Sequence, residues 1–106
     1  MVKVSLCVPY HETPRTAFYL SRLLDSVTKQ SFKDYEIILT HEGPFARNHN
    51  AAITKAKGEI VQMLQMDDYF ADENSLARIY DSFTPTTIWL ISPDLIHKQF
   101  MVFYRV

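Results

Sequence analysis

The chain has 106 residues, and 47% of them are hydrophobic, which is enough for one packed domain over residues 1–106. The 11 Lys and Arg residues nearly balance the 12 Asp and Glu residues, which excludes bulk electrostatic affinity for nucleic acid. The lone cysteine, Cys7, fits a reducing, cytoplasmic compartment, and its apolar surroundings predict a buried side chain. No stretch approaches the roughly 20 apolar residues of a membrane helix, so we expect no membrane span.

Apolar patterns predict strands and helices that alternate along the chain. Residues 2–9 alternate apolar and polar side chains as a strand does, whereas the leucines from Leu20 onward recur at helical spacing. Such alternation is typical of an α/β fold, in which right-handed crossovers build a parallel sheet with helices on its faces. The expected elements are a strand over 2–9, a helix from 14 to about 30, a strand over 37–40, a helix over 46–57, a strand from 60 to the acids at 67 and 68, a helix between 72 and 85, and strands over 87–92 and 99–104.

Three residues are expected to mark helix ends. Thr13 fits an N-cap before Pro14, which suits the first position of a helix. Gly58 fits the C′ position after the second helix, and Asp72 fits the N-cap of the third.

Asp67 and Asp68 end the third predicted strand. In an open α/β sheet, ligands bind in the crevice outside the carboxyl ends of the strands. Carboxylate oxygens are the ligands that Mg²⁺ and Mn²⁺ prefer, so the pair is a candidate cation or ribose site. The alternative is a turn-forming pair, because Asp is common in turns.

Six short motifs follow one another in a specific order. They are VSLCVPY (4–10), LLDSVTKQ (23–30), YEIIL (35–39), ARNHN (46–50), AKGEI (56–60) and LQMDDYF (64–70). In this order they resemble the nucleotide-sugar-binding half of a family 2 glycosyltransferase, and the resemblance covers roughly residues 2–83.

The resemblance implies a three-layer α/β/α sandwich around a mostly parallel, Rossmann-like GT-A sheet, truncated and with extra C-terminal strands. It also implies an enzyme that transfers a sugar from a nucleoside diphosphate sugar, with UDP-sugars favoured, to a hydroxyl acceptor. The implied transfer inverts the anomeric carbon and uses Mn²⁺ or Mg²⁺.

The family's motifs assign expected roles by position. Pro9, Tyr10 and Glu12 match the loop that contacts the nucleotide base. Glu42 matches an acid that hydrogen-bonds the base, whereas His41 stands where a second acid is usual. The alternatives are a strand-ending proline, a partly buried loop tyrosine and a solvated histidine.

The remaining matches concern the diphosphate, the ribose and the metal. Arg47 matches an arginine that reaches the nucleotide or its diphosphate, although it could be an ordinary surface residue. Asp67 matches the ribose contact and Asp68 the metal ligand. Gln65 replaces a further acid of the usual motif.

The acceptor half of such enzymes supplies the general base, and this sequence ends about where that half would begin. Asp94, with His97 nearby, is the remaining candidate for the base, although both lie in a turn that could equally be structural. The strand over 100–104 is apolar and close to the chain end. As an exposed sheet edge it would favour a homo-oligomer.

Two other hypotheses remain open. The chain could be a non-catalytic nucleotide-sugar-binding module or a subunit of a larger complex, as the missing acceptor half and Gln65 suggest. A receiver-like or flavodoxin-like domain explains the alternation of elements but not the ordered motifs.

Overall fold

The computed structural model describes residues 2–86, 89–92, 95–96 and 101–105. Helices and strands alternate as far as the third strand, as the sequence pattern predicts. The elements are β1 (Val4–Pro9), α1 (Thr16–Thr28), β2 (Tyr35–Thr40), α2 (Phe45–Lys55), β3 (Ile60–Met63), β4 (Tyr69–Phe70), α3 (Ser75–Ser82), β5 (Trp89–Ser92), β6 (Leu95–Ile96) and β7 (Met101–Arg105).

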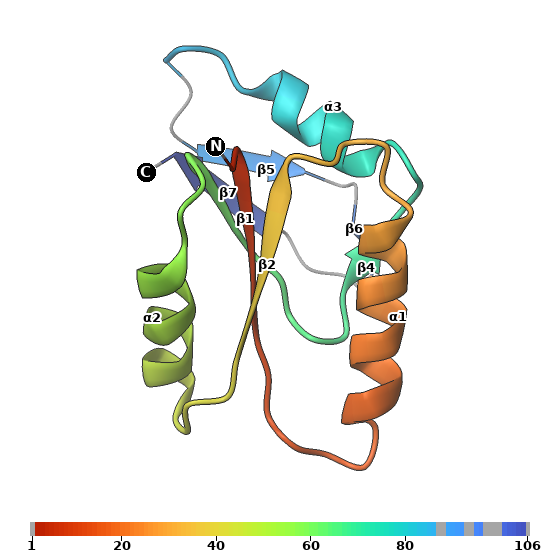
Figure 1. The fold of residues 1–106 in the computed structure, drawn as a ribbon, viewed down its shortest axis with the longest axis vertical. Coiled ribbons are helices and arrows are strands. Elements are labelled where there is room, and N and C mark those ends of the chain that lie inside the picture. Colours follow the sequence, from red (N-terminus) through yellow and green to blue (C-terminus); the bar gives the residue numbers. More distant parts are fainter. Residues whose placement is uncertain (1, 87–88, 93–94, 97–100, 106) are drawn as a thin grey trace.

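The main sheet has the strand order β2-β1-β3-β7-β5 (Figure 1). Strand β1 is parallel to both β2 and β3, with Val4 opposite Tyr35 on one side and Ile60 on the other. Strands β7 and β5 extend the sheet beyond β3 as antiparallel additions. The parallel part of the sheet is therefore the part that the ordered motifs build.

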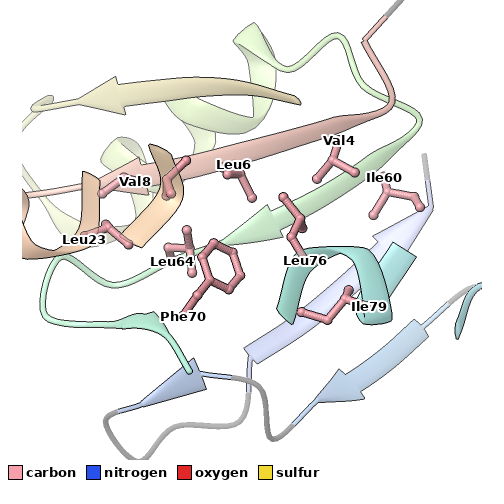
Figure 2. Packing of buried hydrophobic residues seen from close by; sticks show 10 residues of the cluster. Val4, Leu6, Val8, Leu23, Ile60, Leu64, Phe70, Leu76 and Ile79 are labelled. Atoms are coloured by element: carbon pink, nitrogen blue, oxygen red, sulfur yellow. The ribbon is translucent and has the colours of Figure 1, made fainter. Parts of the chain in front are cut away.

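Apolar side chains from alternate strand positions form a core on each face of the sheet. On one face, Val4, Leu6 and Val8 of β1 pack with residues of α1 and α3, as Figure 2 shows. On the other face, Cys7 of β1 packs with Ala52 of α2. Burying a side chain as completely as Leu6 stabilises the fold by about 1.5–3 kcal/mol. The predicted three-layer α/β/α sandwich is confirmed.

Cys7 lies inside the smaller core. Its thiol is fully buried, and its Sγ lies 3.7 Å from the carbonyl oxygen of Ala52. Burial, followed by the negative charge of Glu36, raises the pKa of Cys7 to about 11. The side chain is thus the small buried hydrophobe that the sequence predicts.

Hydrogen bonds around Ser5 fasten the amino edge of the sheet. The Ser5 hydroxyl donates to the Glu36 carboxylate at 2.6 Å and accepts a hydrogen bond from the Gly58 amide at 2.7 Å. The Lys57 amide donates to the same Glu36 oxygen at 2.7 Å. Partial burial raises the pKa of Glu36, but these hydrogen bonds and the charge of Lys57 outweigh it, so the pKa falls below its ordinary value of 4.5.

Gly58 does not serve as the predicted helix C′ residue. Helix α2 ends three residues earlier, and a Cβ atom at Gly58 would lie 2.7 Å from the Ser5 nitrogen and 2.9 Å from the Val4 carbonyl carbon. Glycine is required because the backbone passes directly against β1.

Two helices begin later than predicted, because hydroxyl groups form a turn before each one. The Thr13 hydroxyl accepts the Arg15 amide at 3.1 Å, and the Thr13 amide donates to the Thr16 hydroxyl at 2.7 Å, so α1 starts at Thr16 rather than at residue 14. Asp72 and Ser75 form the corresponding turn before α3.

The strand predicted from residue 60 to the two acids is shorter than expected. Strand β3 ends at Met63, and the chain then turns, with the Asp68 amide donating to the Gln65 carbonyl at 3.0 Å. Strand β4 follows the turn and pairs with β6, a small second sheet that the sequence analysis did not predict.

The last strand is not the sheet edge on which the predicted homo-oligomer was based. Strand β7 pairs with β3 on one side and with β5 on the other, so in the described residues the edges of the main sheet are β2 and β5. Self-association stays a prediction. Among the described residues, no helix is both long and apolar enough to cross a membrane.

Candidate functional site

The loops after β1, β2 and β3 meet at the carboxyl edge of the parallel strands, where α/β sheets usually bind ligands (Figure 1). These three loops and the start of α2 surround a cavity of about 260 Å³. Its lining residues are Pro9, Tyr10, His11, Gly43, Phe45, Asn48, His49 and Gln65.

Asn48 joins three of the elements around this cavity. It lies in the first turn of α2, and its side chain is 5% exposed. Its side-chain amide donates to the Tyr10 carbonyl at 3.0 Å and accepts a hydrogen bond from the Glu42 backbone amide at 3.0 Å. Its main-chain carbonyl accepts the Thr40 hydroxyl at 3.1 Å. Asparagine suits this position because one side chain supplies both a donor and an acceptor.

Two pairs of aromatic rings include residues of the cavity lining: Tyr10, Phe45 and His49 line it, whereas His41 does not. The rings of Tyr10 and His41 are stacked, with centroids 5.0 Å apart and planes 11° from parallel. Phe45 and His49, one helical turn apart on α2, have centroids 3.9 Å apart. The His49 Nδ1 lies 2.9 Å from the Phe45 carbonyl oxygen. Flat apolar faces beside ring nitrogens and amide groups suit a planar, polar ligand such as a nucleobase.

The structure brings only part of the predicted base-binding set together. Pro9 is buried in β1, and Pro9 and Tyr10 both line the cavity. Glu12 and Glu42 are exposed and lie outside its lining, although the backbone of Glu42 is held by Asn48. Arg47 is exposed in the first turn of α2, next to the cavity rather than in it.

The sequence analysis assigned no role to three of the cavity residues, namely His11, Phe45 and His49. Phe45 and His49 are four residues apart, a spacing that makes neighbours on a helix surface, so this pair could have been read from the sequence. Phe45 is also 71% exposed, which is unusual for a large apolar side chain.

Asp67 and Asp68 lie in the turn after β3 and have different surroundings. The Asp68 side chain is fully buried, and its Oδ2 accepts the Gln65 amide at 2.9 Å. Asp67 is half-buried, and its backbone carbonyl accepts a hydrogen bond from Arg22 at 2.9 Å. Asp68 therefore closes the turn, while the Asp67 carboxylate is the more accessible of the two.

The expected metal fits these residues only in part. Oxygen donors are the right kind for Mn²⁺ or Mg²⁺, and the accessible carboxylate of Asp67 suits such an ion. The burial of Asp68 does not fit its predicted role as the metal ligand in this conformation. Within the described ranges, no three His, Cys, Asp or Glu side chains lie close enough together to hold an ion. The predicted general base, Asp94, and its neighbour His97 lie outside the described residues.

Comparison with known proteins identifies the fold. No family model matches the sequence, and no curated protein matches it. Solved structures do match: S. aureus TarS 1–349 in complex with UDP has a TM-score of 0.64 and 20% identity over 76% of this chain. The UDP-GlcNAc complex has a TM-score of 0.63 and 21% identity over 76% of this chain. A further TarS structure has a TM-score of 0.67 and 16% identity over 98% of it.

The matches cover a minor part of the TarS chains, namely 31%, 30% and 28% of their length. In the last comparison the likeness covers almost the whole of this chain. The chain therefore has the Rossmann-like GT-A fold that its motifs imply, in a truncated form.

Proposed function

We propose that this chain is the donor-binding half of a glycosyltransferase that moves a sugar from a nucleoside diphosphate sugar, favourably a UDP-sugar, to a hydroxyl acceptor. The observation that carries the proposal is the cavity with stacked aromatic rings at the carboxyl edge of a GT-A sheet. Support also comes from the TarS structures of the same fold, which contain UDP and UDP-GlcNAc.

The aromatic rings and the acids suggest how the donor is held. The base packs against the Tyr10 ring, whose position is fixed by the Asn48 amide on the Tyr10 carbonyl. Arg47 stands at the start of α2, where free backbone amides and a forked guanidinium both favour a diphosphate. Asp67 contributes its accessible carboxylate to the ribose or to a divalent cation bound with the diphosphate.

A bound Mn²⁺ or Mg²⁺ would offset the negative charge that develops on the leaving diphosphate. In the proposed inverting transfer, the acceptor oxygen forms a bond to the anomeric carbon as the bond from that carbon to the diphosphate oxygen breaks. The acceptor proton passes to a general base, for which Asp94 remains our candidate. We also propose that the enzyme is cytoplasmic and forms a homo-oligomer.

A thermal-shift screen with UDP-, GDP-, CDP- and dTDP-sugars, with and without Mn²⁺, tests donor binding. A ligand at 100 times its Kd stabilises the folded state by about 2.7 kcal/mol, so specific binding raises the melting temperature measurably. We expect the largest shift with UDP-sugars. Tyr10→Phe should retain it because the ring remains, whereas Tyr10→Ala should lose it. A shift that survives Tyr10→Ala unchanged contradicts the proposed base contact.

A second candidate, a non-catalytic binding module or a subunit of a larger assembly, is favoured by one observation. Gln65 stands where the family's motif usually carries a further acid, which leaves fewer carboxylates to hold a metal. Measuring release of UDP from a bound UDP-sugar, with a broad panel of hydroxyl acceptors, separates the two. Binding without turnover supports the module, and turnover supports the enzyme.

A further inference from the structure

Helix α1 lies beside β4, the strand that directly follows the turn with Asp67 and Asp68 (Figure 1). Two polar side chains of α1 reach this segment. The Arg22 guanidinium donates to the Asp67 carbonyl at 2.9 Å, and the Ser26 hydroxyl accepts a hydrogen bond from the Phe70 amide at 3.2 Å. Because Arg22 and Ser26 are one helical turn apart, α1 holds the segment at two points.

Aromatic rings fix the position of the Arg22 side chain. Its guanidinium carbon is 4.3 Å from the centroid of the Tyr69 ring. It is 5.3 Å from the centroid of Phe18 and 5.6 Å from that of Tyr19, which lie one turn earlier on α1. A planar guanidinium can stack on rings while the N–H groups at its rim still donate. Arginine therefore suits a position that must both pack against rings and bind a carbonyl.

Stability alone does not account for an arginine at this position. Arg22 is half-buried, and within the described part of the chain its Nε is buried without a hydrogen-bond partner. A buried donor without a partner destabilises the fold, whereas an apolar side chain would pack against the same rings without that penalty. Natural proteins depart from such rules mainly at functional sites, so we looked for the function that the Arg22 hydrogen bond supports.

That hydrogen bond ends on the residue that is expected to contact the ribose. It fixes the main chain of Asp67, from which the carboxylate projects. The following residue, Asp68, is held separately, because its carboxylate accepts the Gln65 amide at 2.9 Å and its own amide donates to the Gln65 carbonyl at 3.0 Å. The turn is thus closed by its own hydrogen bonds and tied to α1 by Arg22. A binding group has to be held within about 0.5 Å of its productive position, which such bonds provide.

We propose that Arg22 is a positioning residue for the donor: it holds the turn after β3 so that the Asp67 carboxylate accepts hydrogen bonds from the ribose hydroxyls. Without the guanidinium the turn samples other conformations, and the ribose then binds only to the fraction of chains with the correct one. This inference rests on the proposed function, since it concerns the same donor, and it adds the residue that sets the position of Asp67.

Titration calorimetry with UDP and with dideoxyuridine diphosphate, which lacks both ribose hydroxyls, tests the proposal. The two probes share the base and the diphosphate, so the ratio of their affinities reports the ribose contact alone. Hydrogen bonds to a carboxylate are strong, and we expect the full chain to bind UDP roughly tenfold more tightly than the dideoxy probe. Asp67→Ala should abolish this preference. Both titrations are run with and without Mn²⁺, because a contact through a cation affects the two probes equally.

Variants of Arg22 test its part in the preference. Arg22→Met still packs against the rings but cannot donate to the Asp67 carbonyl, so the preference for UDP should fall to about twofold or less, with the affinity for the dideoxy probe nearly unchanged. Arg22→Lys keeps a charged donor but not the planar stacking, and should retain only part of the preference.

Arg15→Met is the matched control. It removes the same charge from the α1 region, and the Arg15 guanidinium carbon has similar ring contacts, 5.1 Å from the Phe18 centroid and 5.3 Å from that of Tyr19. Among the described residues, the Arg15 side chain has no hydrogen bond to the turn after β3. Arg15→Met should therefore keep the whole preference for UDP.

Several outcomes overturn the proposal. Thermal melts first establish that each variant is folded at the temperature of the titration. Equal weakening of both probes in Arg22→Met indicates a general loss of structure or a contact through a cation, and an unchanged preference shows that Arg22 does not position Asp67. If Arg22→Met does not fold, an undiminished preference in Arg22→Lys has the same meaning.

The same titrations separate this inference from the proposed function. A full chain that binds UDP but shows no preference over the dideoxy probe, or a preference that Arg22→Met retains, contradicts the role of Arg22 and leaves donor binding intact. A full chain that binds neither probe contradicts donor binding itself, and the positioning role falls with it.

Discussion

Replacing Asn48 by alanine tests whether one buried amide holds the cavity together. The change removes two side-chain hydrogen bonds, to the Tyr10 carbonyl and from the Glu42 amide. At about 1 kcal/mol for each bond, the loss is about 2 kcal/mol, offset by up to about 0.5 kcal/mol because alanine favours the helix more than asparagine does. The bond from the Thr40 hydroxyl to the Asn48 carbonyl is a main-chain contact and stays.

Asn50→Ala is the matched control. Asn50 is exposed two residues further along the same helix, so its replacement gains the same helix propensity without losing the two bonds. The difference in free energy of unfolding between the two variants should therefore be about 2 kcal/mol, or roughly 10 °C in melting temperature. Urea unfolding followed by far-ultraviolet circular dichroism measures it. A difference below about 0.5 kcal/mol would refute the role of Asn48 as the link between β1, β2 and α2.

The other predictions concern charge and accessibility. Glu36 has a lowered pKa in the folded chain, so it stabilises the fold above its ordinary pKa of 4.5, and this stabilisation is lost as the pH falls through the folded pKa. Glu36→Gln should therefore flatten the dependence of the unfolding free energy on pH, measured by urea titrations at pH 3 to 7. Cys7, with its pKa raised to about 11 by burial, should react with iodoacetamide at neutral pH only after denaturant is added, and rapid labelling of the folded chain contradicts its burial. Asp68→Ala should destabilise the fold by about 1–3 kcal/mol because the Gln65 amide loses its acceptor. Asp67→Ala should destabilise it less, because Asp67 is half-buried, and should lose any Mn²⁺-dependent part of the UDP-sugar shift. The opposite pattern in thermal melts would return the metal role to Asp68.

The parallel half of the sheet was predictable because its signals are local. Each strand up to Met63 is a short apolar run, and the first two strands are each followed by a helix whose spacing is visible in the sequence. The ordered motifs then fixed the fold family, which alternation alone does not distinguish from other α/β domains.

The elements that were missed depend on contacts between distant residues. The end of β3 was misplaced because the Gln65 amide donates to the Asp68 carboxylate, and this bond competes with continued strand pairing. The position of β7 inside the sheet requires Ile60 to pair with Arg105, and no local pattern encodes that partner. The role of Asn48 could not be predicted for the same reason, since it depends on bonds to two other segments.

The register of β1, β2, β3 and β7 also fixes where the two described ends of the chain emerge. Val4 lies opposite Tyr35 and Ile60, and Ile60 pairs with Arg105, so both ends sit at the amino edge of the sheet, away from the cavity (Figure 1). An affinity tag, a fluorescent dye or a surface tether can therefore be attached at either end with the ligand-facing loops still open to solution. The same geometry allows binding of the proposed nucleotide sugar to be measured on an immobilised chain.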